Sequence, residues 1–207
     1  MWHSVVTGSR DAWRALSEAL ITSRARPEDA LRTGLGRMKS VLSSGRSPQV
    51  VRAEFRRVLN DVLHVPQIAR GALWAHWGRL TPTDQRQFVA QFTDFLERLI
   101  VAQLRQLRWV TIRPVSEVVG DRTASVTWRI ATSDTAAILE YRLHWRDGRW
   151  KICDALVNGH SFVAGCREDF DRTIRASSFR ALIADLARRD HAGFVGPGFT
   201  LTAAASQ

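Results

Sequence analysis

The sequence predicts an α+β domain in which N-terminal helices, a four-stranded antiparallel sheet and C-terminal helices follow one another. Apolar residues recur with a period of about 3.6 up to about residue 107, and with a period of two from there to Val157. The helical period then returns and continues through Leu186. Because the four strands are consecutive, they are expected to form a meander whose apolar face is covered by helices.

Prolines mark the starts of four predicted helices, at Pro27, Pro48, Pro66 and Pro82. Ser47 and Thr81 precede two of these prolines and are expected to act as N-caps. The helix from Pro66 is expected to continue through Trp74 to Trp77. The helix from Pro82 is expected to be the longest, with a wide apolar stripe from Phe88 to Leu104.

The four predicted strands cover residues 107–112, 124–130, 139–146 and 149–157. Apolar and polar residues alternate along them, which is typical of a sheet with one buried face. Asp147-Gly148 is expected to form a tight hairpin turn between the last two strands. Two helices are expected after Asn158-Gly159, the second of them capped at Ser177-Ser178.

Residues 27–190 are expected to form a single domain, preceded by an extension (1–26) and followed by a flexible tail (191–207). Hydrophobic residues make up 45% of the 207 residues, which is ample for a buried core. No stretch reaches the ~18 apolar residues of a membrane span. The first 25 residues also do not resemble a secretory signal, because charged residues interrupt them: Arg10, Asp11, Arg14 and Glu18.

The chain is basic, with a formal net charge of +10, and 28 of its 30 basic residues are arginine. A nucleic-acid-binding protein usually gathers such charge on one face or arm, whereas here arginine is spread over almost every segment. We therefore expect no nucleic-acid partner. Anionic lipid headgroups or an acidic partner protein explain the charge at least as well.

Few residues indicate catalytic chemistry. The sequence has no HxxxH or HExxH motif, no zinc-type Cys/His spacing and no glycine-rich phosphate loop after a strand. Cys153 and Cys166 could form one disulfide or remain two buried thiols. Asp154 could act as a general base, but a structural carboxylate that binds backbone amides at the next turn is the favoured interpretation.

An aromatic-rich sheet face is predicted to lie opposite the aromatic-rich helix from Pro82. Such surfaces come together with or without a ligand between them. Taken alone, the pattern favours a filled hydrophobic core over a cavity.

Two stretches resemble the MlaC-type family of lipid carriers, which includes hopanoid-associated HpnM-like relatives. The first comprises Val65-Pro66-Gln67-Ile68-Ala69-Arg70, Trp77, Thr81-Pro82, Gln85-Arg86 and the Phe-rich helix. The second comprises Gly148-Arg149-Trp150-Lys151-Ile152-Cys153-Asp154, Gly159, Ser161, Arg167 and Phe170. The similarity covers about residues 27–190. The chain departs from the family pattern at Cys153, Asn158 and His160, where the family usually has a tyrosine, an acidic residue and an aliphatic residue.

The resemblance implies a periplasmic carrier without catalysis, metal or cofactor, with an apolar cavity between sheet and helices. It also implies a phospholipid or hopanoid-like lipid as cargo, an inner-membrane ABC transporter and an outer-membrane lipoprotein complex as partners, and a monomeric state. The expected lipid-contact residues are Trp77, Phe88, Phe92, Phe95, Leu99, Val126, Trp128, Leu139, Tyr141, Leu143 and Ile152. The alternatives are an enzyme with Asp154 or His144 as its base, and a basic protein or nucleic-acid adaptor with a filled core.

Overall fold

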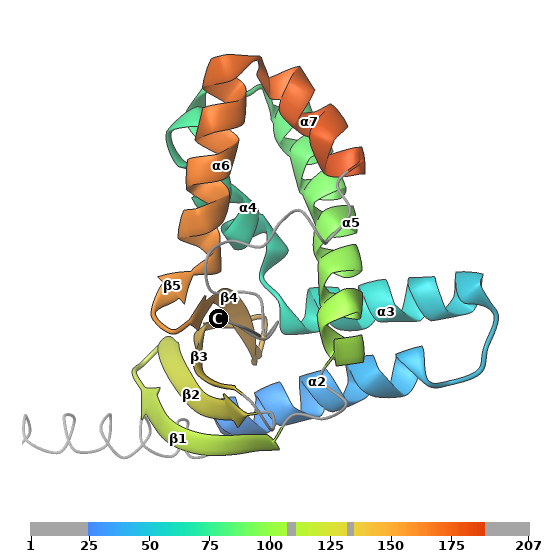
Figure 1. Ribbon diagram of the computed structural model, residues 1–207, viewed down its shortest axis with the longest axis vertical. Coiled ribbons are helices and arrows are strands. Elements are labelled where there is room, and N and C mark those ends of the chain that lie inside the picture. The colour runs from blue at the N-terminus through green and yellow to red at the C-terminus, as the bar shows by residue number, and fades with distance from the viewer. Residues whose placement is uncertain (1–24, 107–110, 132–134, 189–207) are drawn as a thin grey trace, which may run out of the picture.

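The computed structural model describes residues 25–106, 111–131 and 135–188; the remaining residues lie outside the described part of the chain. The predicted tail, most of the predicted extension and residues 107–110 of the predicted first strand fall outside these ranges. Within them, the predicted order of helices, sheet and helices is confirmed (Figure 1).

The helices before the sheet are α2 (Pro27–Leu42), α3 (Pro48–Val62), α4 (Val65–Leu73), the 3₁₀ helix η1 (Trp74–Arg79) and α5 (Pro82–Gln106). Those after it are α6 (Phe162–Ala176) and α7 (Phe179–Arg188). Thr81 caps α5 as predicted, because its hydroxyl accepts a hydrogen bond from the Asp84 backbone N–H at 3.1 Å. Ser47 occupies the N-cap position of α3 and Pro48 its first helical position, as predicted, although the Ser47 side chain makes no capping hydrogen bond; the fixed φ of Pro48 suits a first turn.

The sheet is an antiparallel meander of β1 (Thr111–Val119), β2 (Thr123–Ala131), β3 (Ala136–Arg146) and β4 (Arg149–Val157), with a two-residue β5 (His160–Ser161) added at the edge. Val126 of β2 lies opposite Tyr141 of β3, and Trp128 lies opposite Leu139. This register places the alternating apolar residues of β2 and β3 on one face, which confirms the predicted meander. The end predicted for the first strand, at residue 112, is wrong, because β1 pairs with β2 as far as Val119.

The register between β3 and β4 shifts at Cys153, which is an extra residue in β4. Before this bulge Leu143 lies opposite Ile152, and after it Tyr141 lies opposite Ala155. The inward-facing residues of β4 therefore change from even to odd positions, since a bulge adds one residue to a two-residue repeat.

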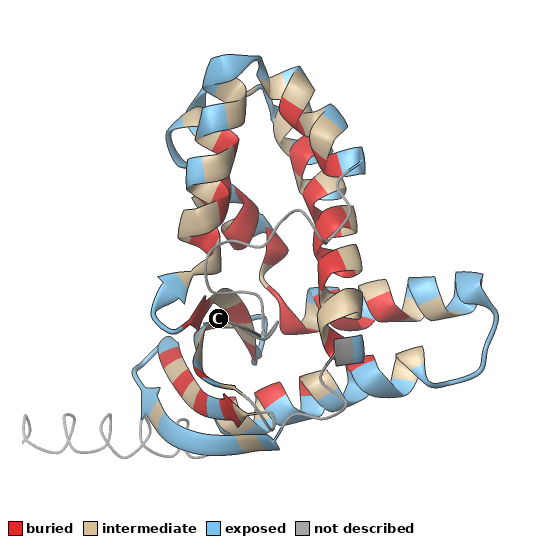
Figure 2. Ribbon diagram, in the orientation of Figure 1, coloured by how far each residue is buried: buried red, intermediate tan, exposed pale blue. Residues whose placement is uncertain are grey.

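Helices cover the inner face of the sheet and also pack on one another. In Figure 1, α5 rises from the sheet toward α7, and α6 rises beside it from β5, while α2 and α3 extend to the side as a hairpin. Buried residues lie on the facing sides of these elements (Figure 2). Phe88 and Phe92 of α5 both meet Phe170 of α6 edge-on, with ring centroids 5.9 Å apart.

Helix α4 is shorter than predicted. It ends at Leu73 because Trp74 has φ 44° and ψ −111°, a backbone conformation that residues with a Cβ rarely adopt. The Trp74 ring is 65% exposed, with the Arg167 guanidinium 4.4 Å from its centre. The prediction that Trp74 and Trp77 continue this helix is therefore wrong; Trp77 lies half-buried in η1.

The Asp154 carboxylate joins β4 to the start of α6. Its Oδ1 accepts hydrogen bonds from the backbone N–H groups of Ala155 (2.9 Å) and Val163 (3.1 Å), and its Oδ2 accepts one from the Ser161 hydroxyl (2.6 Å). Ser161 in turn caps α6 by accepting from the Ala164 N–H. The structural interpretation of Asp154 is confirmed.

We predict that the Trp74→Gly variant is more stable than Trp74→Ala by about 1–2 kcal/mol, because only glycine relieves the strained backbone while both variants lose the indole. Urea unfolding followed by circular dichroism measures the difference. Equal stability of the two variants would show that the backbone at Trp74 is not strained.

We predict that Asp154→Ala lowers the free energy of unfolding by about 3 kcal/mol, because it leaves two backbone donors and a hydroxyl without their acceptor. Asp154→Asn keeps one carbonyl oxygen and should lose about half as much. The same urea titration tests both variants, and a loss below about 1 kcal/mol for the alanine variant would contradict the structural role.

Candidate functional site: an apolar cavity between sheet and helices

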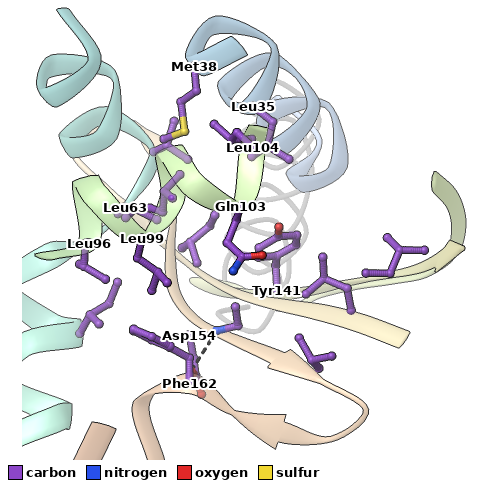
Figure 3. A pocket seen from close by; sticks show the side chains of 18 residues that line it. Leu35, Met38, Leu63, Leu96, Leu99, Gln103, Leu104, Tyr141, Asp154 and Phe162 are labelled. Atoms are coloured by element: carbon purple, nitrogen blue, oxygen red, sulfur yellow. Dashed lines mark hydrogen bonds between the residues drawn. The ribbon is translucent and has the colours of Figure 1, made fainter. Parts of the chain in front are cut away.

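A cavity of about 170 Å³ lies between the inner face of the sheet and the helices above it (Figure 3). Its walls come from α2, the end of α3, α4, α5, the start of α6 and strands β2 to β4. Nearly all of the lining side chains are apolar; among the exceptions are Gln103, Tyr141 and Asp154. The predicted apolar cavity between sheet and helices is therefore present.

The C-terminal half of α5 forms one wall. Leu99 and Ile100 lie three and four residues after Leu96, and Leu104 lies four residues after Ile100, so these residues share one face of the helix. Gln103 lies in the same stripe, seven residues after Leu96, and its amide is the polar group on this wall.

The sheet forms the opposite wall. Leu139 and Tyr141 of β3 face the cavity together with Ile152, Ala155 and Val157 of β4. The last two lie at odd positions, so they reach the cavity only because of the bulge at Cys153.

An ion-pair group holds α5 against α3. The Arg56 guanidinium binds Glu97 at 2.7 Å and also contacts Asp94. Arg52 adds a contact of 3.4 Å to Glu97, which is buried to 9% exposure. Hydrogen bonding to Glu97 is the main cause that raises the pKa of Arg56 above its usual value. These bonds connect α5 to α3 where the cavity-lining part of α5 begins, since Glu97 follows Leu96 directly in the chain.

The polar groups at the cavity differ in their bonding. Both oxygens of Asp154 are occupied at the joint with α6. Tyr141 packs its ring edge-on against Trp128, 5.5 Å away, and burial raises the pKa of its hydroxyl to about 12. Trp128 does not line the cavity; its buried Nε1 donor has no hydrogen-bond partner among the described residues, and the Arg32 guanidinium lies 5.4 Å from its ring.

Four of the predicted lipid-contact residues line the cavity: Leu99, Leu139, Tyr141 and Ile152. The structure brings them together from α5, β3 and β4. Val126, Trp128 and Leu143 are buried on the same face of the sheet but do not line the cavity. Contact of these residues with a lipid stays a prediction.

The other predicted residues lie farther along the helices. Phe88, Phe92 and Phe95 are fully buried in the N-terminal half of α5, which packs on α6 and α7. Trp77 lies in η1, where its carbonyl accepts a hydrogen bond from the Gln85 side chain. Their roles as lipid contacts also stay predictions.

Several lining residues were not predicted, among them Leu35, Met38, Gln103, Ala155, Val157 and Phe162. Leu35 and Met38 were visible as a helix stripe but gave no sign of facing a cavity. Gln103 had a signal: it is a polar residue within an apolar stripe. Ala155 and Val157 had none, because their orientation depends on the bulge.

Among the described residues, the cysteines and histidines form no nucleophilic pair at this site. No disulfide joins Cys153 and Cys166. Burial, and then the Asp154 charge, raises the pKa of the Cys153 thiol to about 11, which leaves it protonated and weakly nucleophilic at neutral pH. Its thiol donates to the Arg142 carbonyl. His144 lies on β3 opposite Lys151, away from the cavity lining.

None of the helices in the described ranges is long and apolar enough to cross a bilayer. Across the same residues, no group of three or more His, Cys, Asp and Glu side chains gathers in a way that could hold a metal ion.

Comparison with solved structures shows the fold in another protein. A phospholipid-binding protein from Ralstonia solanacearum, solved in complex with a phospholipid, superposes with a TM-score of 0.67 at 17% sequence identity. The match covers 82% of this chain and 98% of that one. No curated protein sequence matches significantly.

The sequence also matches a protein-family model. The family model for the MlaC protein matches residues 30–188, which includes every described helix and strand at least in part. The N-terminal helices, the meander and the walls of the cavity all lie in this range. The chain therefore belongs to the MlaC family.

Proposed function

We propose that this protein is a lipid carrier that holds acyl chains in the cavity between its sheet and helices and catalyses no reaction. The observation that carries the proposal is the cavity itself, walled almost entirely by apolar side chains from both layers, in a member of the MlaC family. The phospholipid complex of the Ralstonia protein supports the same type of cargo.

The physical need for such a cavity is simple. Each methylene group exposed to water costs about 0.8 kcal/mol, so a free diacyl lipid does not cross an aqueous gap at a useful rate. An apolar cavity resembles the bilayer interior, so the acyl tails have nearly the same free energy in the cavity and in the membrane. Partner binding then supplies the bias in direction.

The cavity must widen to accept its cargo. Its volume of about 170 Å³ is below the roughly 300–1,000 Å³ of typical ligand pockets. Hydrogen bonds tie the helices to β4 at two places, from the His64 N–H to the Ile152 carbonyl and from the Val163 N–H to Asp154. The C-terminal half of α5 meets the sheet across the cavity lining, and we propose that the cavity widens there. We propose that acyl chains take the place of the wall-to-wall contacts around Leu99 and Leu139.

By family membership, we place the carrier in the periplasm, between an outer-membrane lipoprotein complex and an inner-membrane ABC transporter. The proposed cargo is a phospholipid or a hopanoid-like lipid, and the proposed state is a monomer.

Two alternatives are less well supported. An enzyme would need a free base at the cavity, but the oxygens of Asp154 are bonded and the Cys153 thiol has a raised pKa. A basic adaptor would need a filled core and a gathered positive patch. Instead the core contains a cavity, and several arginines pair with nearby carboxylates, as Arg26 does with Glu117 at 2.8 Å.

We predict that the purified protein contains one lipid molecule per chain, and that Leu139→Trp lowers this occupancy at least tenfold by filling the cavity. Native mass spectrometry, followed by solvent extraction, measures the occupancy and identifies the lipid. The matched control is Ile138→Trp, which places the same ring on the opposite, 41% exposed face of β3 and should retain the lipid.

A wild-type protein that carries no lipid, and takes none up from liposomes, would contradict the carrier function. Equal loss in both tryptophan variants would show that the cavity is not where the lipid binds. Thermal unfolding of each variant establishes that loss of lipid is not loss of fold.

A further inference from the structure

Two polar side chains face the apolar cavity without a hydrogen-bond partner. Among the described residues, neither the Tyr141 hydroxyl nor the Gln103 amide is hydrogen-bonded to another group, although both line the cavity. They come from opposite walls, Tyr141 from β3 and Gln103 from α5. In Figure 3 the Gln103 amide points toward the ring of Tyr141.

Both residues are half-buried, and their polar groups face a lining that is otherwise almost entirely apolar. A hydroxyl or amide that is partly removed from water and has no hydrogen-bond partner is unfavourable, whereas phenylalanine and leucine would fill the same positions without that penalty. The third polar residue of the lining, Asp154, shows the contrast, because protein donors bind both of its oxygens.

The chemistry of the two groups defines the missing partner. The raised pKa keeps the Tyr141 hydroxyl protonated at physiological pH, so it remains a hydrogen-bond donor. The edge-on contact with Trp128 holds its ring in place. The Gln103 amide also offers N–H donors, so the two walls together suit a neutral or anionic acceptor oxygen.

The apolar surface beside them indicates what that oxygen is attached to. Leu99 and Leu96 lie one and two turns before Gln103 on the same wall of α5, so the lining stays apolar for about 10 Å along the helix. An acceptor oxygen at the end of a hydrocarbon chain fits this arrangement, and an acyl carbonyl is such a group.

We propose that Tyr141 and Gln103 bind the carbonyl oxygen of an acyl chain and so select acyl lipids over lipids of the same length that lack this oxygen. The inference rests on the proposed carrier function and deepens it. It places the acyl carbonyl at the polar pair and the hydrocarbon along α5. It also favours an acyl phospholipid over a hopanoid-like cargo, whose ring system carries no acyl carbonyl.

The test is a competition between two phosphatidylcholines with the same headgroup and chain length, one diester and one diether. The full-length protein is incubated with vesicles containing both in equal amounts, reisolated and extracted, and the bound lipids are quantified by mass spectrometry. We expect the wild type to enrich the diester at least fivefold, the effect of one or more neutral hydrogen bonds.

The variants assign the selectivity to the two side chains. Tyr141→Phe and Gln103→Leu should each reduce the diester enrichment about three- to fivefold, and the double variant should bind the two lipids in nearly equal amounts. The control Leu99→Ala alters only apolar surface, so it should lower total loading while keeping the enrichment. Thermal unfolding confirms that each variant is folded.

The outcomes separate the two levels of the proposal. Uptake of both lipids in the vesicle ratio by the wild type would overturn the carbonyl contact and leave the carrier function intact, as would enrichment that both variants retain. Uptake of neither lipid would overturn the carrier function and this inference together. In a parallel arm, enrichment of oleic acid over oleyl alcohol without diester selectivity would assign the contact to a free carboxyl group.

Discussion

The position of helix α5, which forms one wall of the cavity, depends on its contacts with other helices. Phe88 and Phe92 in its N-terminal half pack on Phe170. Its middle is bound to α3 through Arg56 and the buried Glu97, and to α7 through the Arg98 guanidinium, which donates to the Leu186 carbonyl at 2.6 Å. The C-terminal half that follows lines the cavity opposite the sheet.

The opposite wall depends on a second constraint, the connection of β4 to α6. Asp154 bonds the start of α6 to the strand, and the neighbouring Cys153 bulge reverses the direction of the side chains beyond it. A charged carboxylate next to an apolar cavity is tolerable only when donors surround it, and the backbone N–H groups of Ala155 and Val163 provide them. Together the two features place Ala155 and Val157 in the cavity lining and keep the Asp154 carboxylate hydrogen-bonded to donors of the protein.

Hydrogen bonding therefore divides the polar residues of the cavity into two kinds. Asp154 serves the fold, since protein donors bind both of its oxygens. The Tyr141 hydroxyl and the Gln103 amide make no hydrogen bond to any described residue, and this is why they are the better candidates for contact with cargo. Residue type alone does not distinguish Asp154 from Tyr141 and Gln103. The distinction comes from the protein donors that surround Asp154.

The order of the elements is readable from local sequence, because the apolar period changes near residues 107 and 157. It also determined the burial of β2, where Val126 and Trp128 alternate with polar residues. The motifs from Val65 to Arg86 and from Gly148 to Phe170 were sufficient for the family resemblance. These features depend on residues close together in the chain.

Which of the buried residues border the cavity depends on the three-dimensional packing of the elements. Trp128 and Leu139 lie opposite each other on one sheet face, yet only Leu139 lines the cavity. The end of α4 at Trp74 and the β-bulge at Cys153 could not be predicted from the sequence either. Neither the positive φ of Trp74 nor the bulge follows from local composition. The physical reason is that a periodic pattern records which side of an element is buried, whereas a cavity depends on how far apart long-range contacts hold two buried surfaces.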